Sequence, residues 1–384
     1  MVKDVTMIGT LPPLKTNVYY CVPLCESVSK RIKVDFISFK KLYPDFLYPG
    51  KNTKDEDKNF KVHLNKNLKI RRLISYYNPF SWILAGLLPK TKVVHSQWWN
   101  IYMSAFLIPI HSILKLRRKK IVLTVHNVLP HERSILDTII AKATFFLADY
   151  FLVHSEGNKE KLSSIFKINP NKIGVIPMGL HDTFLTEKGL TQEKARKKLN
   201  LPLNAKIILQ FGSIRPYKGV DDMIKAFSII NKKVKNSILL IAGEPWKDWK
   251  DYQDLINKYN LSESVKCYLN YIPMSDVQYF FRAADLVAVP YKEFEAQSGP
   301  GSMALSCYKP LIVSNVGALP ELVREEVALI TPGDYKMLAE NSSKILNSKE
   351  LLKKLSDDSK YFAKKYSWDS VSKEFVKAYD LLEK

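Results

Sequence analysis

The sequence predicts an α/β protein of two domains, each built around a parallel β-sheet whose strands alternate with helices. Short apolar runs, typical of buried parallel strands, recur along the 384 residues and are separated by segments with helical spacing. The length suits two domains of ordinary size. A hydrophobic content of 46% and a charged content of 25% are those of a globular protein.

The first half of the chain contains six apolar runs that predict strands, at residues 5–9, 34–39, 93–96, 121–125, 148–154 and 173–177. Residues 50–67 are polar and charged and indicate an exposed loop. A helix is expected at 79–88. An apolar segment at 102–120 ends in a basic cluster formed by Lys115, Arg117, Arg118, Lys119 and Lys120.

The second half repeats the alternation after a linker and lead-in helix at 180–205. Strands are predicted at 207–211, 238–243, 265–272, 285–290 and 311–314. Apolar residues at helical spacing follow the first of these strands from Val220 to Ile230, and a short helix is expected at 300–306. The tail, 366–384, is amphipathic.

A glycine-bearing loop, Gly212 to Gly219, follows the strand at 207–211 and carries two cations. Arg215 and Lys218 therefore project from the carboxyl end of a parallel strand, where open α/β sheets bind ligands. Arginine offers a two-pronged fork and lysine a compact charge, a pair that suits a diphosphate.

A second loop, after the strand at 285–290, carries Glu295, Gln297, Ser298 and Gly299. A ligand can approach the backbone closely at Gly299 because glycine has no Cβ. The free N–H groups at the start of the next helix would attract an anion. Glu295 is then placed to bind the hydroxyl groups of a sugar.

These two loops resemble the donor half of the family 4 (group 1) glycosyltransferases. Gly212 to Gly219 matches the G-x-x-x-x-x-K-G loop of that family, and Gly317-Ala318-Leu319-Pro320-Glu321 matches its later glycine turn with P-E. Glu295 matches the first glutamate of the Glu-x7-Glu motif. The second glutamate, which contacts the donor ribose in the family, is replaced by Met303.

The resemblance implies the GT-B fold, with two Rossmann-like domains facing each other across a cleft. The first would span 1–185 on the acceptor side, with a helix at 366–384 crossing back to it, and the second would span 200–365 and bind the nucleotide sugar. The family implies sugar transfer with retention of anomeric configuration. Since Arg215, Lys218 and the N–H groups near Ser298 would stabilise the leaving diphosphate, neither a metal nor a cofactor is expected.

The resemblance also implies roles in the first domain. His126 follows the strand at 121–125, and a histidine at its place in the family faces the donor sugar. Three further residues are candidates for the acceptor side. They are Trp98, Trp99 and His131. A lone histidine is more often structural, and the adjacent tryptophans could equally be core residues or lie on lipid.

Asp55-Glu56-Asp57 matches the metal-binding D-x-D of other glycosyltransferases. It lies in a lysine-rich loop with no strand before it, which favours a solvated charge cluster. Two other functions stay open. A GT-B epimerase would need acid and base carboxylates at the cleft, and a non-catalytic binding subunit would fit the Met303 substitution. A phosphorylase would usually be much longer.

The net charge is +21, and residues 1–190 hold 29 basic and only 14 acidic residues. A lysine-rich solvated surface explains this, or attraction to an anionic membrane surface and a lipid-linked or saccharide acceptor. No nucleic-acid motif accompanies the charge. The segment 102–120 is either a membrane-surface element or an ordinary helix whose last turn carries cations.

The compartment is inferred from cysteines and apolar segments. Four cysteines without a CxxC pair fit a reducing compartment, with Cys267 and Cys307 in apolar contexts typical of a core. No signal peptide or membrane-spanning run is recognised. The expected location is the cytoplasm, with peripheral contact at the cytoplasmic face of the membrane as an extension.

Overall fold

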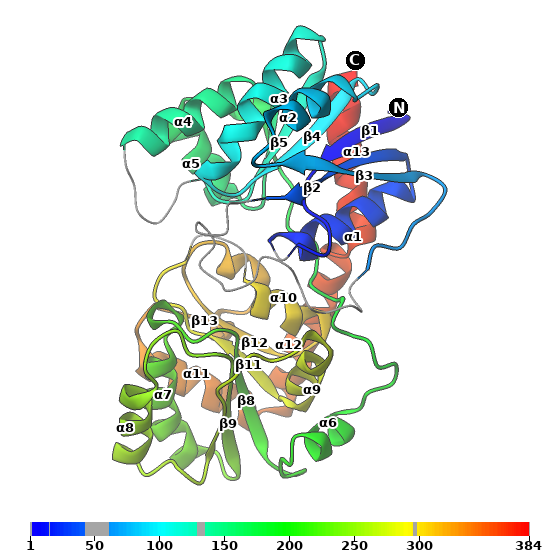
Figure 1. Ribbon diagram of the computed structural model, residues 1–384. Coiled ribbons are helices and arrows are strands. Elements are labelled where there is room, and N and C mark those ends of the chain that lie inside the picture. The colour runs from blue at the N-terminus through cyan, green and yellow to red at the C-terminus, as the bar shows by residue number, and fades with distance from the viewer. Residues whose placement is uncertain (1, 15, 43–60, 129–134, 295–297, 384) are drawn as a thin grey trace. The chain divides into compact units, whose positions relative to one another are not determined.

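The computed structural model describes residues 2–14, 16–42, 61–128, 135–294 and 298–383. The chain forms two compact units, one made of residues 1–179 with 366–384 and one of 180–365 (Figure 1). Four of the features discussed above lie outside the described residues. They are the Asp55-Glu56-Asp57 triplet, His131, Glu295 and Gln297.

The first unit contains a parallel sheet of seven strands in the order β3-β2-β1-β4-β5-β6-β7. The strands are β1 (Asp4–Ile8), β2 (Lys33–Lys41), β3 (Leu68–Ser75), β4 (Val93–Trp98), β5 (Lys120–Val125), β6 (Tyr150–Val153) and β7 (Ile173–Val175). The helices are α1 (Val18–Ser29), α2 (Pro79–Leu87), α3 (Ser104–Leu116), α4 (Ile135–Phe146), α5 (Glu156–Phe166) and α13 (Trp368–Glu383).

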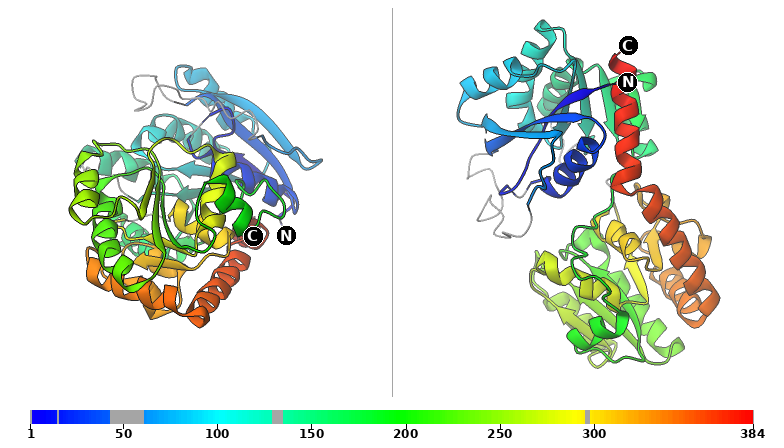
Figure 2. Two further views of the ribbon diagram at one scale, coloured as in Figure 1. Left: turned by 90° about the horizontal axis from the view of Figure 1, so that it is seen from below. Right: turned by 90° about the vertical axis from the view of Figure 1, so that its right-hand side faces the viewer.

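Helices cover both faces of this sheet. One core contains side chains of α3, α4 and α5 packed on the strands, among them Phe106, Phe145 and Phe166. The core of the other face joins α1 to α13 through residues such as Leu24 and Phe375. Figure 2 shows the red helix α13 lying along this unit beside the blue α1. The last helix of the chain is thus part of the first unit.

The second unit contains a parallel sheet of six strands in the order β10-β9-β8-β11-β12-β13. The strands are β8 (Lys206–Phe211), β9 (Ser237–Ala242), β10 (Val265–Tyr268), β11 (Leu286–Val289), β12 (Leu311–Ser314) and β13 (Leu329–Ile330). The helices are α6 (Gln192–Lys198), α7 (Val220–Lys233), α8 (Lys250–Lys258), α9 (Met274–Ala283), α10 (Gly299–Ser306), α11 (Tyr335–Asn347) and α12 (Lys349–Lys365).

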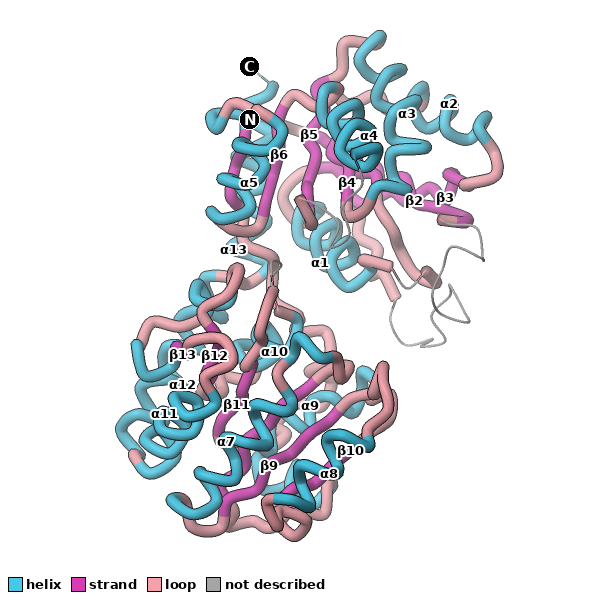
Figure 3. The backbone as a smooth tube through the Cα atoms, turned by 90° about the vertical axis from the view of Figure 1, so that its left-hand side faces the viewer, coloured by secondary structure: helices cyan, strands magenta, loops and turns pink. Residues whose placement is uncertain are grey.

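One face of the second sheet is covered by α7, α8 and α11, whose apolar residues share a core with Ile208, Leu239 and Ile312 of the strands (Figure 3). Two parallel sheets, each alternating with helices, confirm the predicted α/β class. Strands β8 and β11 are neighbours although β9 and β10 lie between them in sequence, so the strand order reverses between β8 and β11.

Two features of the sequence were not interpreted correctly. Strands β3 and β13 were not predicted. Lys69, Arg71 and Arg72 interrupt the apolar residues of β3, and β13 has only two residues. Each is the edge strand of its sheet. Cys267 was expected in the core but is exposed on edge strand β10, whereas Cys21, Cys25 and Cys307 are buried; all four are free thiols.

Candidate functional site

The loops after β8 and β11 begin at adjacent strand ends and leave toward opposite faces of the second sheet. The loop after β8 leads to α7, whose side chains lie in the core on one face, and the loop after β11 leads to α10. Such a reversal of strand order opens a crevice at the carboxyl ends of the strands, the usual ligand site of a doubly wound sheet.

Two glycines shape the first loop. Gly212 has φ of +105°, and a Cβ there would lie 3.0 Å from Lys218 Nζ and 3.3 Å from Pro300 Cγ. Gly219 has φ of +66°, and a Cβ there would lie 2.0 Å from the Pro290 carbonyl oxygen. Both positions therefore require glycine. The close approach at Gly212 brings the loop, Lys218 and the start of α10 together.

Arg215 is held by an aromatic side chain from a different loop. Backbone bonds between Ile214 and Glu244 (2.8 Å) and between Trp246 and Ile214 (3.0 Å) join the segments after β8 and β9. They place the Trp246 ring under the guanidinium, with Arg215 Cζ 3.3 Å from the ring centroid. Arg215 Nε is buried and has no hydrogen-bond partner among the described residues. A ligand oxygen would satisfy it.

Lys218 is a buried cation, with only 9% of the residue exposed. Its ammonium lies 5.6 Å from the centre of the Tyr291 ring. Burial, and then the charge of Arg215, lower the pKa of Lys218 to about 8. Across the described ranges, neither Arg215 nor Lys218 forms an ion pair with a carboxylate. Two neighbouring unpaired cations are a binding site for a polyanion such as a diphosphate.

The nearest carboxylates are neutralised elsewhere. Asp221 Oδ2 lies 2.8 Å from Lys292 Nζ and 3.1 Å from Lys225 Nζ, and these lysines lower the pKa of Asp221 against the effect of its burial. Lys292 also joins the two loops through its backbone N–H, which donates to the Tyr217 carbonyl at 2.7 Å. The positive charge of Arg215 and Lys218 is therefore not cancelled by the start of α7.

The start of α10 contributes less than the sequence indicated. Ser298 is buried, and its Oγ accepts from the Gly301 N–H at 3.2 Å as the N-cap of the helix. Pro300 has no N–H, which leaves the Gly299 N–H as the accessible donor. A Cβ on Gly299 would meet open space, so a ligand can come close. Met303 lies partly buried one turn further along α10.

In the first unit, His126 follows β5 directly, and its N–H donates to the Trp98 carbonyl at 2.9 Å. Its ring lies in a network of polar side chains at the carboxyl ends of β1, β4, β5 and β6. His126 Nδ1 lies 3.1 Å from His154 Nε2, and His154 Nδ1 lies 2.9 Å from the Ile176 carbonyl oxygen. The other nitrogen, Nε2, contacts Asn17 and Gln97, so both ring nitrogens of His126 are in contact with the protein.

These contacts determine where the protons lie. The Ile176 carbonyl can only accept, so His154 carries its proton on Nδ1 and offers the lone pair of Nε2 to His126. His126 then carries its proton on Nδ1 and has a lone pair on Nε2. Burial lowers the pKa of His154 to about 4 and that of His126 well below its ordinary value, so both rings are neutral near pH 7.

The Gln97 amide lies between two histidines, with one amide atom 2.9 Å from His126 Nε2 and the other 3.1 Å from His95 Nε2. The structure has Gln97 Oε1 toward His126 and Gln97 Nε2 toward His95, but since His126 Nε2 has a lone pair, we assign the reversed amide, whose nitrogen donates to His126. The Nε2–H of His95 then faces Thr124 Oγ1 at 2.7 Å and the amide oxygen. His95 Nδ1 then accepts from the Tyr379 hydroxyl of α13 at 2.7 Å. The network extends across the whole unit.

Asn17 completes the network from the loop after β1. Its Nδ2 lies 3.2 Å from His126 Nε2 and donates to it. Two amide groups therefore surround the lone pair of His126. The geometry suits a fixed hydrogen-bond acceptor at the strand ends and does not suit a proton donor.

The two tryptophans differ from each other. Trp98 is 1% exposed and packs edge-on against Phe145, so its ring lies in the core and offers no surface for stacking on a sugar. Trp99 is also largely buried, with its ring 6.4 Å from that of His126. Its carbonyl accepts from Asn127 Nδ2. Trp99 therefore lies beside the histidine network, whereas the ring of Trp98 lies in the core.

Sequence analysis missed several members of both sites. Trp246 and Tyr291 flank the cations of the second unit, and Asn17, Gln97 and His154 surround His126. His154, Gln97 and Tyr291 each lie at or next to the end of a predicted strand, a signal that could have been noticed. Among the described residues, no group of three or more His, Cys, Asp or Glu side chains could hold a metal ion.

Comparison with known proteins places these features in a class. Anabaena HepE in complex with UDP has a similar structure, with a TM-score of 0.72 at 15% identity over 98% of this chain and 99% of that one. Two doubly wound parallel sheets with this likeness define the GT-B fold. The profile of the group 1 glycosyl transferases matches residues 191–362, and that of glycosyltransferase family 4 matches residues 24–184. The chain belongs to the group 1, family 4 glycosyltransferases.

Two curated relatives share about a quarter of the aligned residues with this chain. The D-inositol 3-phosphate glycosyltransferase of Corynebacterium glutamicum is 26% identical over 243 residues, which are 61% of this chain and 57% of the relative. The chain thus spans little more than half the length of that relative. The lipopolysaccharide 1,2-N-acetylglucosaminetransferase of Salmonella typhimurium is 24% identical over 70% of this chain and 71% of its own.

Proposed function

We propose that the protein transfers a hexosyl group from a nucleoside diphosphate sugar to a lipid-linked or saccharide acceptor, with retention and without a metal ion. The observation that carries the proposal is the pair of unpaired cations, Arg215 and Lys218, beside the start of α10. Breaking the anomeric bond leaves negative charge on the diphosphate, and fixed cations in a partly desolvated site stabilise that charge. Glu295 would position the sugar hydroxyl groups, and His126 would hold the sugar by accepting a hydrogen bond from one of them.

A donor screen tests the proposal directly. HepE was crystallised with UDP, so UDP-glucose is a sensible first probe, followed by other uridine, guanosine and adenosine diphosphate sugars. A ligand that binds the native state raises the unfolding temperature by mass action. One sugar nucleotide should raise it and then be hydrolysed or transferred. If no nucleotide changes the unfolding temperature, the proposal is wrong.

A binding subunit without turnover is the second candidate, because Met303 replaces the glutamate expected to hold the donor ribose. Such a protein would bind a sugar nucleotide and release it unchanged. Donor hydrolysis or transfer by the native protein would exclude this candidate. In Met303→Glu, a restored ribose contact should tighten binding of the sugar nucleotide in either case.

The pKa of Lys218 leads to a prediction about pH. A bound diphosphate favours the charged ammonium, which the free protein loses as pH rises through about 8. The Kd of UDP should therefore rise by up to about tenfold for each pH unit above 8. Calorimetric titrations between pH 7 and 9.5 measure this. In Lys218→Arg the Kd should stay flat, because arginine keeps its charge; a flat profile in the native protein would contradict the assignment.

The second prediction concerns metals. Because Arg215, Lys218 and the Gly299 N–H take the place of a cation on the diphosphate, sugar transfer should persist unchanged in excess EDTA. The assay needs a divalent-free substrate and a parallel sample with added Mn²⁺. Loss of transfer in EDTA that Mn²⁺ restores would assign a metal to the protein and reopen Asp55-Glu56-Asp57.

The third prediction concerns an anionic membrane surface. Within the described residues, no helix is long and apolar enough to cross a membrane. Part of the basic cluster is structural: Lys115 pairs with Asp149 at 2.8 Å, Arg117 donates to the Gly86 and Pro89 carbonyls, and Lys119 donates to the Lys90 carbonyl.

Arg118 and Lys120 remain exposed in that cluster. Replacing both with Gln should weaken binding to phosphatidylserine vesicles by roughly thirtyfold at low salt, since each cation contributes about 1 kcal/mol. Vesicle sedimentation measures the change. The matched control replaces Lys232 and Lys247 of the second unit with Gln, which removes the same charge and should have little effect. An equal loss of vesicle binding in both variants would mean that net charge alone causes the effect.

A further inference from the structure

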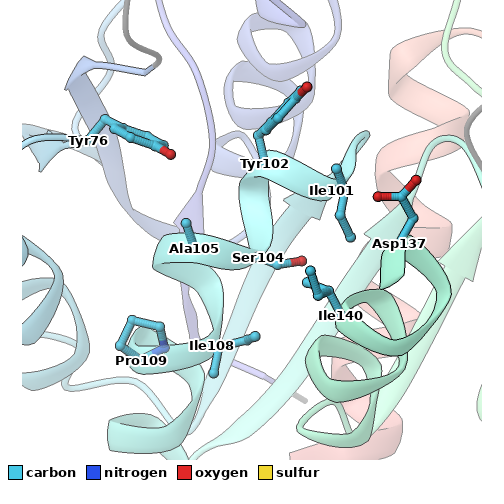
Figure 4. A pocket seen from close by; sticks show the side chains of 9 residues that line it. All are labelled: Tyr76, Ile101, Tyr102, Ser104, Ala105, Ile108, Pro109, Asp137 and Ile140. Atoms are coloured by element: carbon cyan, nitrogen blue, oxygen red, sulfur yellow. The ribbon is translucent and has the colours of Figure 1, made fainter. Parts of the chain in front are cut away.

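A pocket of about 450 Å³ lies in the first unit, and none of its lining residues belongs to the histidine network (Figure 4). It is lined by residues from the end of β3, from the 3₁₀ turn after β4 and from the facing sides of α3 and α4. They are Tyr76, Ile101, Tyr102, Ser104, Ala105, Ile108, Pro109, Asp137 and Ile140. A volume of this size is within the usual range for small-molecule sites.

The pocket lies at the carboxyl-terminal edge of the first sheet. Tyr76 directly follows β3, Ile101 begins the short turn that follows β4, and Asp137 is in the first turn of α4. His126 follows β5 at the same edge. A ligand in the pocket therefore enters the unit from the side on which parallel sheets bind substrates.

The lining suits a hydrocarbon better than a sugar. Five of the residues in Figure 4 are aliphatic or proline: Ile101, Ala105, Ile108, Pro109 and Ile140. The Ser104 oxygen is buried and accepts from Thr144 Oγ1 at 2.8 Å. The other polar groups of the lining are Asp137, Tyr76 and Tyr102. The aliphatic residues offer a sugar hydroxyl no partner, whereas an apolar chain can be buried against them without that cost.

The surface around the pocket is also apolar. More than half of the exposed large hydrophobic side chains described in the structure come from residues 77–146. Helices α2 and α4 both pack against α3 and carry them on either side of it. They include Phe80, Ile83, Leu84 and Leu87 on α2 and Ile139, Ile140 and Phe146 on α4. A surface of this kind marks contact with a lipid or another apolar partner.

Lys41 is a backbone neighbour of Tyr76, one of the residues that line the pocket. The Tyr76 N–H donates to the Lys41 carbonyl at 2.9 Å, and Lys41 Nζ lies 5.1 Å from the centre of the Tyr77 ring. An apolar chamber with a cation beside it is complementary to a hydrocarbon chain that carries a phosphate. The basic cluster at 115–120 is at the other end of α3 and does not contribute here.

We propose that this pocket binds the hydrocarbon chain, isoprenoid or acyl, of a phosphate-bearing lipid that carries the acceptor. The inference rests on the proposed function in one respect, the lipid-linked acceptor. The hydrocarbon chain of the lipid enters between α3 and α4, and the lipid phosphate lies toward Lys41. The acceptor group is thereby presented at the edge of the sheet where His126 lies.

The probe is farnesyl phosphate, used below its aggregation concentration. Its binding to the 384-residue protein is measured by calorimetry. Two variants change the lining at partly exposed positions where folding should be kept. Ala105→Trp fills the chamber, and Ile140→Asp places a charge on its wall. Ile139→Asp is the matched control, because it is the next residue of α4 but does not line the pocket.

We expect one saturable site in the native protein. Ala105→Trp and Ile140→Asp should weaken it by more than about tenfold, the effect of losing about two buried methylene groups. Ile139→Asp should stay within a factor of about two of the native affinity, since neighbouring exposed substitutions have small effects. Inorganic phosphate should not displace the probe at the same concentration. Lys41→Gln should weaken farnesyl phosphate and leave farnesol unchanged.

Three results would overturn the proposal: no saturable binding, native affinity in Ala105→Trp, or equal weakening by Ile139→Asp and Ile140→Asp, which would indicate adsorption on the outer surface. The thermal shift with UDP-glucose is run on the same samples. Farnesyl phosphate binding with the expected variant pattern but without any nucleotide binding would contradict the proposed function and leave the pocket assigned. Nucleotide binding without farnesyl phosphate binding would overturn the assignment of the pocket and leave the proposed function in place.

Discussion

Replacing either Arg215 or Lys218 with Ala should lower the rate of sugar transfer by about a hundredfold, because each charge-stabilising group contributes about 3 kcal/mol at the transition state. The two side chains are the unpaired cations at the point where the strand order of the second sheet reverses. Arg215 lies flat on Trp246, and Lys218 is buried against Gly212. Neither can be replaced by a neighbouring cation, because Lys225 and Lys292 are paired with Asp221.

Steady-state rates with the best donor from the thermal screen measure the effect. Lys225→Ala is the matched control, since it removes a nearby cation of α7 that already has a carboxylate partner, and its rate should stay near that of the native protein. Lys218→Ala should also fold at least as well as the native protein, because removing a buried charge relieves its desolvation. Native rates in both alanine variants would mean that the diphosphate lies elsewhere.

Replacing His154 with Phe should lower kcat by about tenfold to a hundredfold, the usual effect of removing a group that orients a functional side chain. His154 holds the proton of His126 on Nδ1 through its bond to the Ile176 carbonyl. Without that bond the His126 proton can move to Nε2, and the lone pair that faces Asn17 is lost. His154 itself acts only through His126 and is a positioning residue.

Two measurements separate positioning from folding. The ¹⁵N shifts of the His126 ring should report a proton on Nδ1 in the native protein and a mixture of tautomers in His154→Phe. His154→Gln keeps an amide oxygen that can accept from His126 Nδ1, so it should recover part of kcat. An unchanged His126 tautomer in His154→Phe, or an equal loss in the Gln variant, would assign His154 to packing alone.

The fold was predictable from sequence where strands are buried on both faces. Ile207 to Phe211 and Asp285 to Pro290 are apolar runs, and they form β8 and β11 within one residue of the expected bounds. Strand β3 was missed because an edge strand keeps lysine and arginine on its solvated side and has no such run. Burial on two faces leaves a signal in the sequence, whereas pairing along one edge does not.

Only those residues of the candidate site that lie close together in the sequence could be predicted. Arg215 and Lys218 stand in one eight-residue loop, so their spacing could be recognised directly. Trp246 contacts Arg215 from the loop after the next strand, and His154 reaches His126 across 28 residues. Such contacts follow from sheet order and register, which no short motif contains. The pocket between α3 and α4 likewise depends on how two helices pack.

The placement of α13 has a consequence for how the protein is made. The first unit needs residues 366–384 to cover one face of its sheet, whereas the second unit, 180–365, is continuous. On the ribosome the first 179 residues emerge early but keep Tyr20, Leu24 and Phe36 uncovered until Phe375 and Tyr379 arrive. The middle of the chain can finish folding before its beginning does, the reverse of the usual order of synthesis. The first unit therefore cannot close before residues 366–384 have been made.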